Sequence, residues 1–125
     1  MKLKKPNNKF EDLFYSIPKY ARDIQANVRL LLNPEHAPLD QQYLIGIALS
    51  AAYAANNTLV QDALLETAKC VLDEVSLNVI KSANSIMAMS NMYYRFTSLV
   101  TDDEYSRLPI GLRMNVVSNQ SVSKR

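Results

Sequence analysis

Apolar residues recur at steps of three and four positions along 17–32, which is the spacing of one face of an α-helix. Polar and charged residues fill the positions between them. Ser16 is a residue type that caps helices, and Pro18 suits the first turn, where its missing N–H removes no hydrogen bond. The pattern predicts a helix over 17–32 that buries one face. The members of that face are Ile17, Tyr20, Ala21, Ile24, Val28, Leu31 and Leu32.

A second stretch, 43–55, is almost continuously apolar and rich in alanine. It has 13 residues, fewer than the ~20 that a membrane-spanning helix needs. It therefore predicts a helix that is capped by Asp40 and buried on most sides. The small side chains of this helix would allow other helices to approach it closely. Two asparagines are expected to end this helix before the next one begins. Thr58 and Gln61 form the capping-box pattern of that next helix, whose inward face extends to Leu72.

A long third pattern predicts a helix from Ser76 to about Leu99, with apolar residues on more than one face. We expect so apolar a helix to contact a second partner, either another subunit or a further part of the same chain. Thr101 and Glu104 form another capping-box pattern, and a short last helix is predicted over about 110–118. The predicted core face comprises Leu77, Ile80, Ala83, Met87 and Tyr94, widened by Met89, Met92, Tyr93 and Phe96.

These patterns predict an all-α fold of about five to six helices, because only two glycines occur and no long run of alternating polarity indicates strands. A chain of 125 residues holds one domain at most, and its 48% hydrophobic and 21% charged residues are typical of a globular protein. We expect residues 1–9 to form a solvated basic tail and 10–125 to form the helical domain. A weak electrostatic anchor is the alternative role for the tail.

The formal net charge of +2 is a product of the two ends of the chain. Five basic residues lie there: Lys2, Lys4, Lys5, Lys124 and Arg125. Without them the chain has 9 basic and 12 acidic residues, a net charge of −3. A nucleic-acid-binding protein needs a basic face to neutralise phosphates, and the sequence indicates none.

Most cofactor and metal chemistry is excluded by residue types. Gly46 and Gly111 stand alone, so neither a phosphate-binding loop nor a dinucleotide fingerprint can form. One histidine and one cysteine cannot supply a zinc site of nitrogen and sulfur ligands, and we expect no metal or cofactor. A lone cysteine allows no intrachain disulfide, and the start of the chain resembles no signal peptide. Both features favour the reducing cytoplasm.

Cys70 and His36 remain as the candidate catalytic residues. Helical spacing would place Glu66, Asp73 and Glu74 near the thiol in the middle of a helix, and negative charges disfavour a thiolate. This setting favours an inert thiol over a nucleophile, and a solvated acidic face over an acid–base pair. His36 belongs to a loop flanked by prolines, and nothing in the sequence places it beside Cys70.

Three stretches resemble the AhpD-like alkyl hydroperoxidases of the carboxymuconolactone decarboxylase-type helical superfamily. They are "IPKYARDIQANVRLLL" (17–32), "SIMAMSNMYYRF" (85–96) and "RLPIGLRMNVVSN" (107–119). The alanine-rich stretch 48–68 also resembles the hairpin that this family carries between the first two stretches. The similarity runs in order from about residue 10 to residue 124.

The resemblance implies an all-helical homotrimer of antioxidant defence that relays electrons to a peroxiredoxin partner. It also implies a Cys-x-x-Cys motif with nearby histidines and a glutamate, downstream of every segment seen here. Cys70 does not match that motif, since no cysteine follows three residues later. The expectation is therefore an N-terminal half that is inactive alone. The alternatives are a non-catalytic helical oligomerisation or binding module, and an unrelated helical domain.

Overall fold

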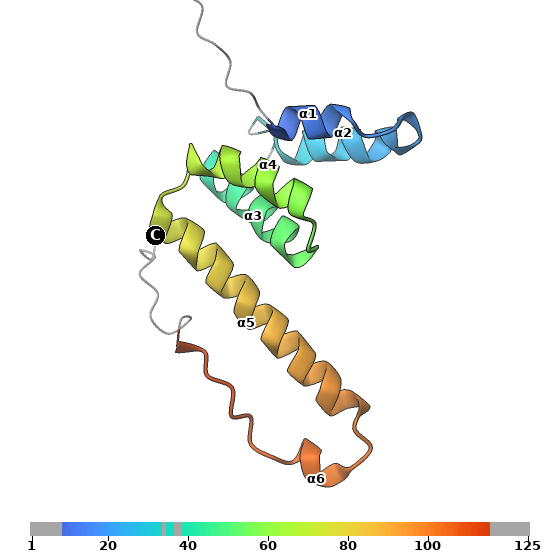
Figure 1. Ribbon diagram of the computed structural model, residues 1–125, viewed down its shortest axis with the longest axis vertical. Coiled ribbons are helices and arrows are strands. Elements are labelled where there is room, and N and C mark those ends of the chain that lie inside the picture. Colours follow the sequence, from blue (N-terminus) through green and yellow to red (C-terminus); the bar gives the residue numbers. More distant parts are fainter. Residues whose placement is uncertain (1–8, 34, 37–38, 116–125) are drawn as a thin grey trace, which may run out of the picture.

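The computed structural model describes residues 9–33, 35–36 and 39–115. Within these ranges the chain forms six α-helices and one short 3₁₀ helix, with no strand, which confirms the predicted all-α fold (Figure 1). The helices are α1 (Lys9–Tyr15), η1 (Lys19–Ala21), α2 (Arg22–Leu31), α3 (Gln41–Ala54), α4 (Thr58–Lys69), α5 (Glu74–Leu99) and α6 (Asp103–Ser106). No helix in the described part of the chain is long and apolar enough to cross a membrane.

The core lies between the α3–α4 hairpin and the first turns of α5. Leu49 of α3 is fully buried, and Ala68 of α4 is buried equally. Alanines bring the helices close together, so a few large side chains fill the space between them. The buried cluster comprises Ile45, Leu49, Ala52, Leu64, Ala68 and Leu77. The expectation that 43–55 forms a largely buried helix is confirmed for its inner face, although Tyr43 and Ile47 are exposed.

The turn between α3 and α4 uses both asparagines. Asn56 adopts a φ of 54°, a left-handed conformation that asparagine tolerates better than most residues. Asn57 then caps α4, because its side-chain oxygen accepts a hydrogen bond from the Val60 N–H at 3.2 Å. The predicted capping box was therefore wrong by one residue, and Thr58 is the first residue inside the helix. The Gln61 amide instead donates to the Ala52 carbonyl of α3 at 3.2 Å.

The start of α5 also differs from its prediction. Asp73 caps the helix by accepting a hydrogen bond from the Ser76 N–H at 2.8 Å, so Ser76 lies inside the first turn. Hydrogen bonds from the side chain and then the backbone of Ser76 lower the pKa of the Asp73 carboxyl group. The predicted capping box at Thr101 and Glu104 shifts in the same way, since Asp102 caps α6.

The segment before α3 is broken where one helix was predicted. The Ser16 hydroxyl donates to the Leu13 carbonyl at 2.6 Å, so this residue closes α1 instead of opening the next helix. Helix α1 was not predicted, and it packs against α4. Its first residue, Lys9, was expected in a solvated tail but forms an ion pair with Glu66 of α4. That carboxylate raises the pKa of Lys9. Residues 1–8 of the expected tail lie outside the described residues.

Helix α2 buries none of its residues, so the buried face predicted for 17–32 was wrong. Tyr20 is 92% exposed, and Ile24 and Leu31 are 59% and 67% exposed. The periodic pattern formed the helix, but its apolar side is only half-buried at Val28 and Leu32, and no described element covers Tyr20, Ile24 or Leu31. One hydrogen bond that ties it to α1 runs from the Gln25 amide to the Phe14 carbonyl at 3.1 Å.

Helix α5 extends well beyond the α3–α4 hairpin, and its C-terminal half lies clear of the other long helices (Figure 1). Leu77 is buried as predicted, whereas Met87 and Tyr94 are 56% and 51% exposed because α3 and α4 end before they reach them. The chain over 110–114 is not helical, so this part of the predicted last helix was wrong. The remainder, 116–118, lies outside the described residues.

Candidate functional site

The sequence indicated that Cys70 lies in the middle of a helix, but in the structure it is the C-cap of α4. Its side chain is exposed, and Sγ donates a weak hydrogen bond to the Glu66 carbonyl at 3.5 Å. The C-terminal end of a helix favours cations over anions. Cys70 therefore lacks the N-terminal helix dipole that activates many catalytic thiols.

The three carboxylates expected beside Cys70 do not share one helix. Glu66 lies on α4 and is paired with Lys9. Asp73 is the N-cap of α5 and accepts from Ser76, and Glu74 is the first residue of α5. Two of these carboxylates thus have structural partners. Because the three carboxylates belong to two helices, they lack the spacing within one helix on which the acid–base pair would depend.

His36 lies in an exposed turn after α2. Its Nδ1 atom is 3.1 Å from the Asn33 side-chain nitrogen, and its backbone N–H donates to the Asn33 carbonyl at 3.1 Å. Within the described residues, no hydrogen bond or ion pair joins His36 to Cys70. That part of the chain also contains no cluster of three or more histidine, cysteine or acidic residues that could hold a metal ion.

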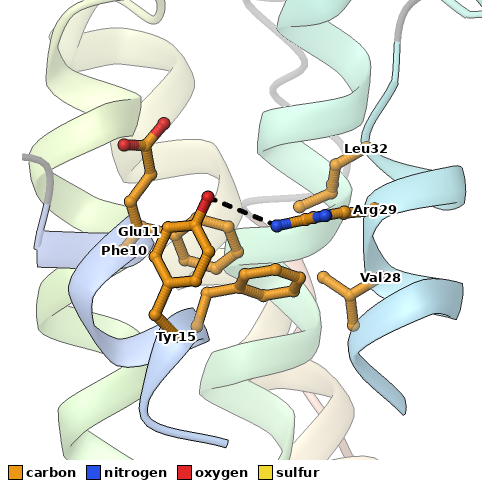
Figure 2. A pocket seen from close by; sticks show the side chains of 7 residues that line it. Phe10, Glu11, Tyr15, Val28, Arg29 and Leu32 are labelled. Carbon is orange, nitrogen blue, oxygen red and sulfur yellow. Dashed lines mark hydrogen bonds between the residues drawn. The ribbon is translucent and has the colours of Figure 1, made fainter. Parts of the chain in front are cut away.

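Sequence reasoning missed a hollow between α1 and α2, with a volume of about 250 Å³ (Figure 2). The Arg29 guanidinium lies 5.2 Å from the centre of the Phe14 ring and 5.6 Å from that of Tyr15. Its Nη2 also donates to the Tyr15 hydroxyl at 3.3 Å. Contacts of a cation with aromatic faces are favourable and orient the side chain. The hollow is lined by Phe10, Glu11, Phe14, Tyr15, Val28, Arg29 and Leu32.

This hollow offers a cation, aromatic rings and an apolar floor, but no nucleophile beside a base. Its chemistry is that of binding and not of bond cleavage. The signal that could have indicated this hollow was the presence of three aromatic residues, Phe10, Phe14 and Tyr15, within one short helix. Because α1 was not predicted, those rings could not be placed opposite Arg29.

Comparison with known proteins finds similar proteins over most of the chain. No protein-family profile matches the chain. Alkyl hydroperoxide reductase AhpD of Coxiella burnetii is 43% identical over 110 residues, which cover 87% of this chain and 62% of the relative. The proteins of the same name from Azorhizobium caulinodans and Brucella anthropi are 39% and 37% identical over 114 residues, or 91% of this chain. The chain is AhpD-like.

The sequence identity to these relatives excludes the alternative that the chain is an unrelated helical domain. The AhpD-like chain spans less than two thirds of the length of these relatives, since the matches cover 62–64% of them. Over a third of each relative therefore has no counterpart in the AhpD-like sequence. The thiol chemistry available to this sequence is that of Cys70 alone.

Proposed function

We propose that the AhpD-like chain is the N-terminal helical part of an alkyl hydroperoxide reductase, which reduces peroxides only together with a catalytic segment bearing a Cys-x-x-Cys motif. The observation that carries the proposal is the 43% identity over 110 residues to a protein named alkyl hydroperoxide reductase AhpD. The resemblance extends it to a cytoplasmic homotrimer that delivers electrons to a peroxiredoxin.

The need for a second thiol follows from the chemistry. A first thiolate attacks the peroxide O–O bond, releases the alcohol and becomes a sulfenic acid. A second thiol displaces water from that sulfenic acid and forms a disulfide, which an external dithiol reduces. Cys70 could perform the first step at most, from an exposed position at the end of α4. Alone, the chain is therefore expected to be inactive.

The C-terminal half of α5 supports this proposal because it lacks the charged residues that a helix exposed to water normally carries. Residues 82–94 carry no charged side chain, and Arg95 is the one charge between Lys81 and Asp102. Met92, Phe96 and Leu99 are 70%, 59% and 71% exposed. Exposed helices normally carry charges on the side that faces water. We infer that further protein covers this half of α5 in the complete reductase.

The total surface area supports the same inference. The chain exposes 10570 Å², whereas a compact monomer of 14.1 kDa exposes roughly 6,700 Å². The exposed area is thus larger than that of a compact chain, as expected where faces of the described helices are left uncovered.

The activity test compares the chain with its Cys70→Ser variant and with the intact Coxiella burnetii relative. Dithiothreitol-dependent consumption of tert-butyl hydroperoxide is followed for each protein. The chain and its variant should give the same background rate, while the relative turns over. Sustained turnover by the chain that disappears in Cys70→Ser would refute the proposal.

The exposed methionines and aromatics of α5 also favour a second candidate function, a non-catalytic module that self-associates. Size-exclusion chromatography at several concentrations separates the two. A single oligomer that is stable on dilution supports the module. Concentration-dependent aggregation, relieved when the unmatched part of the Coxiella burnetii protein is added as a separate polypeptide, supports the incomplete reductase.

A further inference from the structure

The hollow between α1 and α2 has apolar walls and one polar corner (Figure 2). Two stacked rings form the wall on α1, since the ring centres of Phe10 and Phe14 lie 6.1 Å apart at an interplanar angle of 29°. Val28 and Leu32 form the wall on α2, and both side chains are half-buried. Walls of this kind favour a ligand whose body is apolar.

The polar corner of the hollow is formed by Arg29 and Tyr15. The Nη2 atom of Arg29 donates to the Tyr15 hydroxyl oxygen at 3.3 Å, so the hydroxyl keeps its own proton for a further acceptor. The guanidinium lies 5.2 Å and 5.6 Å from the ring centres of Phe14 and Tyr15, and these contacts orient it. Within the described residues no carboxylate pairs with Arg29, since the recorded ion pair joins Lys9 to Glu66. Two hydrogen-bond donors thus converge on one corner, and the positive charge beside them is not neutralised.

An occupant that fits both parts of the hollow carries one carboxylate on a short apolar body. A carboxylate accepts hydrogen bonds from a guanidinium and from a hydroxyl at the same time, whereas an alcohol offers Arg29 no charge. Glu11 lies on the rim and is exposed, so its negative charge disfavours an occupant with two charges, such as phosphate at neutral pH. The volume of about 250 Å³ is below the ~300 Å³ at which sites for drug-sized ligands begin, so the occupant is small.

We propose that the hollow between α1 and α2 binds a small amphipathic monocarboxylate, of which a medium-chain fatty acid is the simplest case. The carboxylate pairs with the Arg29 guanidinium and accepts a hydrogen bond from the Tyr15 hydroxyl. The apolar chain lies between the rings of α1 and the aliphatic side chains of α2. No covalent bond is made or broken at this site. The inference goes beyond the proposed function, which could fail without affecting it.

Titration of the ¹⁵N-labelled chain with octanoate tests the site by NMR. Saturable shifts should be confined to amides of α1 and α2, with a dissociation constant on the order of 0.1–1 mM for so small a ligand. Octanol and inorganic phosphate are the matched probes, because each has one half of the required chemistry. Each should bind at least about tenfold more weakly than octanoate. Absence of saturation, shifts centred on α5, or equal binding of either matched probe overturns the proposal.

Variants of the polar corner test the two donors. Arg29→Met should weaken octanoate binding about tenfold and leave octanol binding unchanged, because the substitution removes only the partner of the carboxylate. Arg22→Met is the matched control, since Arg22 is also exposed on α2 but does not line this hollow, and it should change neither affinity. Tyr15→Phe keeps the ring and removes the hydroxyl, so it should weaken octanoate binding about threefold even if Arg29→Met disturbs the packing of α1. Equal weakening by Arg22→Met, or unchanged octanoate binding in both Arg29→Met and Tyr15→Phe, overturns the proposal.

Discussion

Replacement of Leu49 by alanine tests the packing on which the whole fold depends. Leu49 is fully buried between α3, α4 and α5. Loss of the three carbon groups that distinguish leucine from alanine removes about 2.4 kcal/mol of transfer free energy, at ~0.8 kcal/mol per group. The cavity left behind adds to this, so Leu49→Ala should lower the free energy of unfolding by about 3 to 4 kcal/mol. Small domains are stable by only about 5–15 kcal/mol in total.

Urea denaturation followed by helical circular dichroism measures the effect. The midpoint should fall while the slope stays unchanged, because the surface exposed on unfolding hardly changes. Leu59→Ala is the matched control, since Leu59 lies on α4 and is 69% exposed. This substitution should change the free energy of unfolding by no more than about 0.5 kcal/mol. If Leu49→Ala costs less than about 1 kcal/mol, or no more than the control, the hairpin core described above is wrong.

Three further predictions concern helix ends and ion pairs. Asn57→Ala should lower the free energy of unfolding by about 1 kcal/mol, and Thr58→Ala by less than about 0.5 kcal/mol, in thermal denaturation; the reverse order would restore the capping box predicted from sequence. The lowered pKa of Asp73 means that its contribution is complete above the usual value of 3.8 and is lost as the pH falls through the folded value. Asp73→Asn keeps a capping oxygen without the charge, so the urea midpoint of this variant should depend less on pH below 5 than that of the parent, and an unchanged dependence would count against the cap. The raised pKa of Lys9 means that its contribution is present below the usual value of 10.5 and is lost as the pH rises through the folded value. Lys9→Met should therefore speed amide exchange in α1 at neutral pH, and equal exchange in both proteins would show that the pair with Glu66 does not hold this helix.

Local patterns in the sequence were sufficient for the long helices. The three-and-four spacing and the alanine-rich composition predicted α3, most of α4 and α5, because helix formation depends on residues within one or two turns. Asp40 is the N-cap of α3 as predicted, whereas the caps of α4, α5 and α6 were misplaced by one to three residues. Several polar residues compete at each helix start, and the backbone direction before the helix decides which side chain accepts the hydrogen bond. Asn57 and Asp73 prevailed over Thr58 and Ser76 for this reason.

The covering of each helix face was decided only by tertiary structure. Helix α2 has the pattern of a half-buried helix, yet no described element lies over Tyr20, Ile24 and Leu31. Arg29 meets the rings of α1 only because a helix that the sequence did not indicate packs beside it. Periodicity specifies which residues share a face, but what that face contacts depends on residues far away in the chain. The sequence therefore determined the long helices and their shared faces, whereas packing decided which of those faces are buried, paired or left open.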